Sequence, residues 1–273
     1  MLLRTQLRIG RIGVDVLRRE EALNAITRLV DEKVGGYVFT PNVDHVVMAE
    51  DMDELARAYA AARLSLADGM PILWASRILG RSLPEKLSGS DMLEPIVSIA
   101  AAAGWPVYLL GGRQGSVEAA AKRLCEIFPR LQIAGMDSPL MSLAPGHVGT
   151  REALERVRRS MPRILLVGLG GPKQELLLYR ASEFLGPILS FGVGAAIDFT
   201  AGAVPRAPAW MSRVGLEWFY RLCKEPRRLW RRYLVRDPRF IGVVWRTLRR
   251  PRDERIQTLP LLPGARASLA PLS

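Results

Sequence analysis

Short apolar runs alternate with longer segments of helical periodicity along most of the chain. Strands are predicted at residues 11–17, 36–40, 64–67, 105–110, 131–136, 163–167 and 188–191. The segments between them, such as residues 18–33 and 116–128, carry apolar side chains at the spacing of an amphipathic helix. Apolar strands joined by helices favour a mainly parallel sheet with helices on both faces. We therefore predict an α/β fold.

Positive charge is concentrated near the C-terminus. The formal net charge is +12, and residues 205–250 carry thirteen Lys or Arg against three Asp or Glu, whereas residues 1–204 are nearly neutral. A basic block of this kind indicates an anionic partner, either nucleic acid or a membrane surface. We divide the chain into a core (1–204), a basic and aromatic appendage (205–250) and a loose tail (251–273).

Composition excludes several classes of protein. The two cysteines, Cys125 and Cys223, cannot form a disulfide framework or a cysteine metal site, and two histidines are too few for a histidine-rich metal centre. The N-terminus has no apolar signal segment. The longest weakly polar run, residues 186–204, contains Asp198 and several glycines and fits a buried strand and loop better than a membrane span. We expect a reduced, cytosolic protein.

Small and polar residues follow five of the predicted strands. They are Thr40 and Asn42, Asp68 and Gly69, Gly111 and Gly112, Gly168 to Gln174, and Gly192 to Gly194. Because the carboxyl ends of parallel strands meet at one edge of a sheet, where ligands bind, these segments predict a single cleft. Glycines allow close backbone approach and helix N-termini attract anions, so a nucleotide diphosphate is the expected guest.

Two common nucleotide motifs are incomplete. In the segment 168–173, Lys173 stands where a dinucleotide fingerprint needs its third glycine, and the chain has no phosphate-binding loop of the NTPase type. A nucleotide-dependent oxidoreductase therefore remains only an alternative. A nucleic-acid-binding protein is a second alternative, which would explain residues 205–250 but leave the strand-end cluster without a role.

Several carboxylates and histidines admit two interpretations. Asp68, at the mouth of a buried strand, fits a general base and fits equally well the N-cap of the next helix. Asp51 and Asp53 form an Asp-x-Asp pattern, but in a helical context that favours a solvated helix start over a metal site. We expect hydrogen-bonded structural roles for His45 and His147.

Eight stretches together resemble one family. They are TPNVDH at 40–45, ADG at 67–69, SGSD at 88–91, GLGGPKQE at 168–175, GVGAAIDF at 192–199, RAP at 206–208, GLEW at 215–218 and EPRR at 225–228. In this order they resemble the WecG/TagA/CpsF glycosyltransferases, family 26, which includes N-acetylmannosaminyltransferases. The resemblance covers roughly residues 9–234.

The resemblance implies an inverting transfer from a UDP-sugar donor to a sugar on a polyprenyl diphosphate, with no metal and no other cofactor. It also implies a Rossmann-like core with an appendage that docks on an anionic membrane, and so a peripheral protein on the cytoplasmic face of the plasma membrane. The product would be a cell-surface polysaccharide precursor. The donor sugar, N-acetylmannosamine or a related hexose, stays open, as does assembly into a homo-oligomer; nucleic acid is not an expected partner.

The same resemblance suggests roles for individual residues. The proposed base falls on Asp68 and the active-site threonine on Thr40, and Gln174 of the PKQE motif is the third expected catalytic residue. Asn42 of the TPN motif is expected to bind substrate. Lys86 stands where the family often has an arginine for the diphosphate, and a lysine cannot form the same two-pronged contact. The other expected substrate-binding residues are Gly69, Gly111, Gly112, Gly168, Gly170, Gly194, Arg213 and Arg221.

The basic appendage contains an amphipathic pattern. Leu229, Trp230, Tyr233 and Leu234 recur at helical spacing, and Arg227, Arg228, Arg231 and Arg232 interleave with them. One interpretation is an interfacial helix on anionic lipid. The other is a helix that packs its apolar face on the core and leaves its arginines in solvent.

Overall fold

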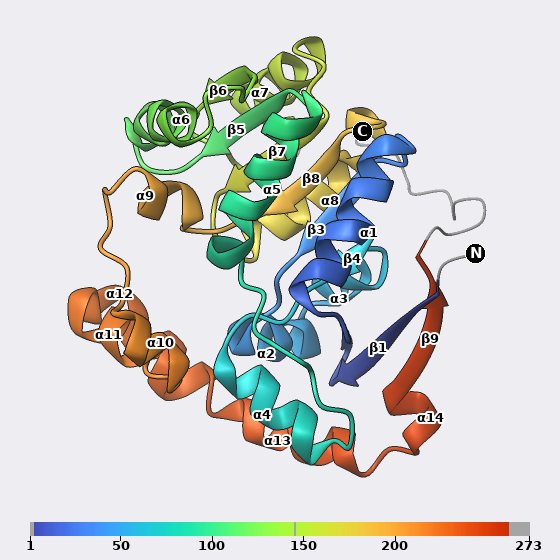
Figure 1. Cartoon of the computed structure of the whole chain (residues 1–273). Coiled ribbons are helices and arrows are strands. Elements are labelled where there is room, and N and C mark those ends of the chain that lie inside the picture. Colours follow the sequence, from blue (N-terminus) through green and yellow to red (C-terminus); the bar gives the residue numbers. More distant parts are fainter. Residues whose placement is uncertain (1–2, 145, 262–273) are drawn as a thin grey trace.

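A central sheet of six parallel strands organises the protein. The computed structural model describes residues 3–144 and 146–261, without the side chains of Ala209, Arg213 and Arg228. The strands lie in the order β4-β3-β8-β7-β5-β6. Their bounds are β3 Gly36–Phe39, β4 Leu64–Ser65, β5 Val107–Gly111, β6 Ile133–Asp137, β7 Ile164–Gly168 and β8 Leu189–Gly192. Helices cover the sheet (Figure 1), and the predicted α/β, Rossmann-like fold is confirmed.

Two hydrophobic clusters, one on each face of the sheet, hold the helices in place. One face is covered by α2 (Val43–Asp51), α3 (Asp53–Ala60), α7 (Val148–Arg159) and α8 (Lys173–Leu185). The other is covered by α1 (Arg19–Asp31), α5 (Gly89–Ala103), α6 (Ser116–Ile127) and α9 (Ala196–Thr200). Both faces are buried, which is why the strands are apolar without alternation.

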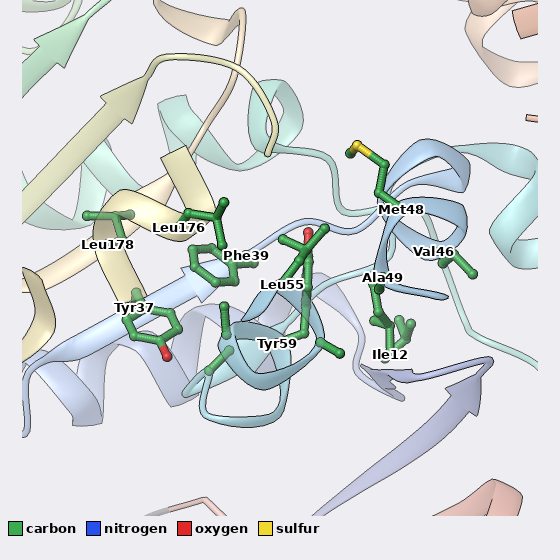
Figure 2. Close-up of a cluster of buried hydrophobic side chains, with 14 of the residues drawn as sticks. Ile12, Tyr37, Phe39, Val46, Met48, Ala49, Leu55, Tyr59, Leu176 and Leu178 are labelled. Carbon is green, nitrogen blue, oxygen red and sulfur yellow. The ribbon is translucent and has the colours of Figure 1, made fainter. Parts of the chain in front are cut away.

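Strand β3 shows how the two clusters divide. Tyr37 and Phe39 point to the face of α3 and α8, whereas Val38 between them belongs to the opposite cluster. The rings of Tyr37 and Phe39 stack with centroids 4.6 Å apart, and Tyr59 meets Phe39 edge-on at 5.2 Å. Figure 2 shows these rings beside Leu176 of α8. This packing anchors the strand that leads to Thr40 and Asn42.

A second, three-stranded antiparallel sheet lies beside the core, in the order β2-β1-β9. The strand expected at residues 11–17 is present as β2 (Ile12–Asp15), but it pairs with β1 (Leu3–Ile9) rather than joining the parallel sheet. β9 (Ile256–Pro260) pairs with the other edge of β1 and follows α14 (Arg252–Arg255). The prediction of a loose tail from residue 251 is therefore wrong up to residue 261. This segment is ordered because its backbone forms the hydrogen bonds of a β-ladder with the distant N-terminal strand. Residues 262–273 of that tail lie outside the described residues.

A buried ion pair fastens the small sheet to the central one. Arg4 donates to Asp15 at 2.8 Å, and the Ser65 backbone N–H donates to the same carboxylate oxygen at 2.7 Å. The burial of Asp15 raises its pKa, against the lowering effect of Arg4. Because β4 has only two residues, this bond to Ser65 helps to position the segment that leads to Asp68.

The C-terminal helices follow the core as α10 (Ala209–Arg213), α11 (Glu217–Lys224), α12 (Pro226–Trp230), the π-helix η1 (Arg231–Arg236) and α13 (Arg239–Leu248). In Figure 1 they are orange and run below the sheet, as does α4 (Met70–Ile78). No helix within the described residues is long and apolar enough to cross a membrane.

Helix α13 is part of the core even though the sequence places it in the appendage. Phe240, Val243 and Val244 belong to the larger hydrophobic cluster. The Gly10 backbone N–H donates to the Thr247 hydroxyl at 2.8 Å. The main body of the protein thus includes residues from both ends of the chain.

Candidate functional site

A cavity of about 500 Å³ opens at the carboxyl edge of the sheet. Its walls come from the loops after β3, β4, β7 and β8, and from the C-terminal helices α11 to α13. Nine of the predicted site residues line it: Thr40, Asn42, Asp68, Gly69, Lys86, Gly170, Gln174, Gly194 and Arg221. The side chain of Arg213 lies outside the described part of the chain. Four of the five strand-end segments therefore converge on one cavity, as their positions predict, and the segment at Gly111 and Gly112 does not.

The four contributing strands are neighbours in the sheet, and β5 lies beyond them. Gly111, Gly112 and Gly168 do not line the cavity. They instead allow close packing: a Cβ on Gly111 would lie 2.8 Å from the Gly168 carbonyl oxygen, and one on Gly168 would lie 2.9 Å from the Gly194 carbonyl oxygen. A role in substrate binding stays a prediction for these three, while their structural effect is to bring Gly194 to the cavity.

Asp68 is held at the cavity by the backbone around it. Its N–H donates to the Pro41 carbonyl at 3.0 Å, which joins the loops after β3 and β4. The residue that caps α4 is Gly69, whose φ of +98° favours glycine, and no side chain caps this helix. The N-cap interpretation of Asp68 is therefore wrong. Its carboxylate makes no side-chain hydrogen bond within the described residues and faces the cavity.

The surroundings of Asp68 raise its pKa to about 6. Burial is the main cause, and the negative charge of Glu217 adds to it, while Lys86 and Arg221 act in the opposite direction. A carboxylate with such a pKa is mostly ionised at neutral pH and holds a proton more readily than an ordinary aspartate. These are the properties of a general base.

Two cations share one carboxylate on the cavity wall. Lys86 precedes Leu87, whose backbone N–H donates to the Ala67 carbonyl at 2.7 Å, so Lys86 lies beside the strand end that carries Asp68. Its Nζ lies 3.8 Å from Glu217 Oε2, and Glu217 Oε1 lies 2.8 Å from Nη2 of Arg221.

Asp91, at the start of α5, is a second partner of Lys86, at 3.0 Å. Burial opposes its ionisation, but the hydrogen bond from Ser88 and the charges of Lys86 and Arg206 lower its pKa overall. The cavity therefore contains cations suited to an anion, each already balanced by a carboxylate.

A third cation, Arg232, joins the π-helix to the start of α2. Its Nε lies 3.2 Å from Asp44, which is buried and also pairs with Arg236. It also donates to the side-chain oxygen of Asn42 at 3.3 Å. The sequence pattern places Arg232 on a solvated or membrane-facing surface, and the structure turns it toward the cavity instead.

The amphipathic pattern of residues 227–234 is divided between two surfaces. Leu229 and Tyr233 line the cavity, while Trp230 and Leu234 are 43% and 59% exposed. Neighbouring residues on a helix are about 100° apart, so each of these two pairs, whose members are four residues apart, falls on its own side. One side of the pattern thus packs inward and the other is exposed, and docking of the exposed side on anionic lipid stays a prediction.

A buried polar network links three of the loops around the cavity. The Gly194 N–H donates to Gln174 Oε1 at 3.0 Å, and Gln174 Nε2 donates to Glu175 Oε1 at 2.8 Å. His45 Nε2 lies 3.6 Å from the same oxygen of Glu175. Burial raises the pKa of Glu175 to about 7. The loops after β3, β7 and β8 are therefore held together below the cavity.

Sequence reasoning overlooked Glu175, because an acidic residue in the first turn of a helix is usually solvated. Its one signal was the four-residue PKQE motif that contains it. His45 has the expected structural role: burial, then the charges of Arg232 and Arg236, lower its pKa to about 3, and its Nδ1 accepts from the Asn42 N–H at 3.3 Å. His147 likewise caps α7 by accepting from the Thr150 N–H at 3.1 Å.

The Asp-x-Asp pattern lies away from the cavity, at the junction of α2 and α3. Asp51 pairs with Arg239 at 2.7 Å and Asp53 pairs with Arg11 at 2.7 Å. The two carboxylates thus form ion pairs with different arginines. Asp51 ends α2 and Asp53 begins α3, as the helical context predicts. Within the described residues no group of three or more His, Cys, Asp or Glu side chains is arranged to hold a metal ion.

Comparison with known proteins identifies the family. The model of the glycosyl transferase WecG/TagA/CpsF family matches residues 7–254, nearly the whole described chain. The chain belongs to this family. The resemblance drawn from the motifs and the prediction of an enzyme that transfers a hexosyl group are thereby confirmed.

Two curated relatives carry the same name, N-acetylglucosaminyldiphosphoundecaprenol N-acetyl-beta-D-mannosaminyltransferase. The protein of Bacillus subtilis (strain 168) is 27% identical over 206 residues, which is 75% of this chain and 77% of the relative. That of Bacillus spizizenii is 27% identical over 219 residues, or 80% of this chain and 82% of the relative. The similarity thus extends over three quarters or more of this chain and of each relative.

Proposed function

We propose that this glycosyltransferase moves a hexose, N-acetylmannosamine or a close relative, from a UDP-sugar to a sugar carried on a polyprenyl diphosphate. The names of the two relatives support the acceptor class and the sugar. The observation that carries the proposal is the cavity itself, where the carboxylate of Asp68, which has no side-chain hydrogen bond among the described residues, faces a space bordered by Lys86 and Arg221. The arrangement supplies a base for an acceptor hydroxyl and cations for a departing diphosphate.

The reaction we propose has one chemical step. Asp68 takes the proton of the acceptor hydroxyl as the oxygen forms a bond to the anomeric carbon of the donor. The bond from that carbon to the UDP oxygen breaks on the opposite face, and UDP leaves with the electron pair. The configuration at the anomeric carbon is inverted, because a single displacement occurs and no carboxylate forms a covalent intermediate.

The charge that develops on UDP needs stabilisation in the transition state. Lys86, Arg221 and Arg232 border the cavity and can supply it, which supports a reaction without a metal ion. Backbone N–H groups of the loops at Gly170 and Gly194 can add hydrogen bonds to phosphate oxygens. We assign Thr40 and Gln174 to holding the donor sugar, since both line the same space.

The mouth of the cavity suits a lipid-linked acceptor. Ile241 lines the cavity yet is 75% exposed, and Gly215, also in the lining, packs against Trp74 of α4, which is itself exposed. Exposed tryptophans with neighbouring arginines are typical of proteins that lie at a membrane interface. We propose peripheral attachment to the cytoplasmic face of the plasma membrane, where the enzyme would extend a precursor of a cell-surface polysaccharide.

The test is a donor screen. Purified protein is incubated with each of several UDP-hexoses and a short-chain polyprenyl-diphosphate N-acetylglucosamine. The mass of the lipid-linked product is then measured by mass spectrometry. We expect one hexosyl unit to be added, with the highest rate for UDP-N-acetylmannosamine or a close analogue, and an anomeric configuration opposite to that of the donor. Absence of transfer from every UDP-sugar, or retention of the configuration, would contradict the proposal.

A further inference from the structure

Glu217 contacts two cations whose charges act on Asp68, namely Lys86 and Arg221. It comes from the first turn of α11, so it reaches the cavity from the C-terminal helices rather than from the core. One carboxylate oxygen lies 2.8 Å from Arg221 and the other 3.8 Å from Lys86. The Ser212 hydroxyl donates to it at 3.2 Å. One carboxylate thus bridges a cation of the core and a cation of the appendage.

The charge balance of the cavity conflicts with an anionic ligand while Glu217 stays there. Among the side chains that the structure describes, the charged residues of the lining are Asp44, Asp68, Glu217 and Asp237 against Lys86, Arg221 and Arg232. These four carboxylates and three cations of the described lining leave no positive excess for a diphosphate, and like charges placed together in an interior are strongly unfavourable. Removal of one carboxylate from the cations is therefore needed before a diphosphate can bind well.

Glu217 is the carboxylate most readily displaced from Lys86. Its separation of 3.8 Å from Nζ is longer than a hydrogen bond, whereas Asp91 contacts the same nitrogen at 3.0 Å. Asp91 is also held by the Ser88 hydroxyl at 2.7 Å and by Arg206. Asp91 therefore keeps Lys86 in place while Glu217 can leave it.

We propose that Glu217 is a placeholder anion, which positions Lys86 and Arg221 in the empty site and is exchanged for the diphosphate of the donor. This inference rests on the proposed function and adds to it the residue that the ligand must displace. Glu217 acts through the two cations and is a positioning residue. The carboxylate of Glu217 keeps Lys86 and Arg221 ordered in the absence of donor. Because the donor must displace it, Glu217 also lowers the affinity for the donor.

The experiment compares two isosteric substitutions by calorimetric titration with UDP and, separately, with inorganic pyrophosphate. Glu217→Gln removes the charge in the cavity. Glu225→Gln is the matched control, because Glu225 ends the same helix and pairs with Arg113 of the core at 2.9 Å, outside the cavity lining. Both substitutions change the net charge equally, and both remove an ion pair between the C-terminal helices and the core.

We expect Glu217→Gln to bind UDP and pyrophosphate about tenfold more tightly than the unaltered protein, within the usual range of coupling between sites. Glu225→Gln should bind both as the unaltered protein does. Unchanged or weaker binding by Glu217→Gln would overturn the inference, and so would equal tightening by the control, which would indicate net charge alone.

The two ligands separate this inference from the proposed donor. Tighter pyrophosphate binding by Glu217→Gln, with no UDP binding by any of the proteins, would support the exchange of anions and contradict a uridine donor. Binding of UDP that is equal in the unaltered protein and in Glu217→Gln would support the donor and refute the exchange. Failure of both ligands to bind would refute both.

Discussion

The pKa of Asp68 leads to a prediction about the pH dependence of transfer. Burial and the charge of Glu217 raise this pKa to about 6, from an ordinary aspartate value of 3.8. If Asp68 is the base, only its ionised form is active. With a pKa of about 6, roughly a tenth of the enzyme is ionised at pH 5 and roughly nine-tenths at pH 7. We therefore expect kcat/KM to fall about tenfold per pH unit below pH 6.

The assay is initial-rate measurement from pH 4.5 to 8.5 with a soluble short-chain acceptor, for the unaltered protein and for Asp68→Asn. The substitution should lower turnover by about 10²-fold or more at neutral pH, because it removes the base and keeps the shape. It should leave most of the UDP affinity. Turnover within a few-fold of normal in Asp68→Asn, or an acidic limb near pH 4 in the unaltered enzyme, would refute the assignment.

The same pKa shift predicts the effect of this substitution on stability. Since the pKa of Asp68 is raised in the folded state, folding disfavours the ionised carboxylate. The free energy of unfolding therefore decreases as the pH rises from 3.8 through about 6. Asp68→Asn cannot ionise and should melt at a higher temperature than the unaltered protein at pH 7.5. The difference should disappear at pH 4. A lower melting temperature at pH 7.5 would mean that the ionised carboxylate stabilises the fold instead.

Three further predictions follow from the remaining contacts. Activity should survive excess EDTA, since Asp51 and Asp53 pair with arginines; loss of activity that Mn²⁺ or Mg²⁺ restores would contradict this. Reversal of the exposed Arg227 and Arg231 to Glu should lower co-sedimentation with anionic vesicles at least tenfold and make it less salt-dependent. The reason is that each basic residue near such a surface contributes about 1 kcal/mol to binding. Unchanged sedimentation would refute docking through this face. Glu175→Leu should lower kcat/KM about tenfold, because it leaves the buried amide of Gln174 without a hydrogen-bond acceptor. Glu175→Gln keeps an acceptor, and its kcat/KM should be near normal. Equal kcat/KM values for the two variants would refute the role of this network.

Much of the site was accessible from the sequence because its determinants are local. Apolar runs mark strands, and the polar or small residue that ends each run marks the edge where a parallel sheet binds ligands. Thr40, Asn42, Asp68, Gly170 and Gln174 were found in this way, and all five line the cavity. The family could be named because its motifs are long and occur in a fixed order along the chain.

Other features depended on which segments meet in space. The order β4-β3-β8-β7-β5 excludes Gly111 from the cavity, although its sequence context resembles that of Gly194. The pairing of β9 with β1 joins residues more than two hundred positions apart, and no local pattern in either segment specifies the other.

The sequence by itself determined the class of fold, the strand ends that form the site and the type of reaction, because short-range apolar patterns and ordered motifs encode them. Only the tertiary structure decided how the charges are used. It paired Arg232 with Asp44, set Glu217 between Lys86 and Arg221, and buried Glu175 below the cavity. A charged residue looks the same in a sequence whether it is solvated or buried, and its pKa and its partners are set by neighbours that folding brings from distant parts of the chain.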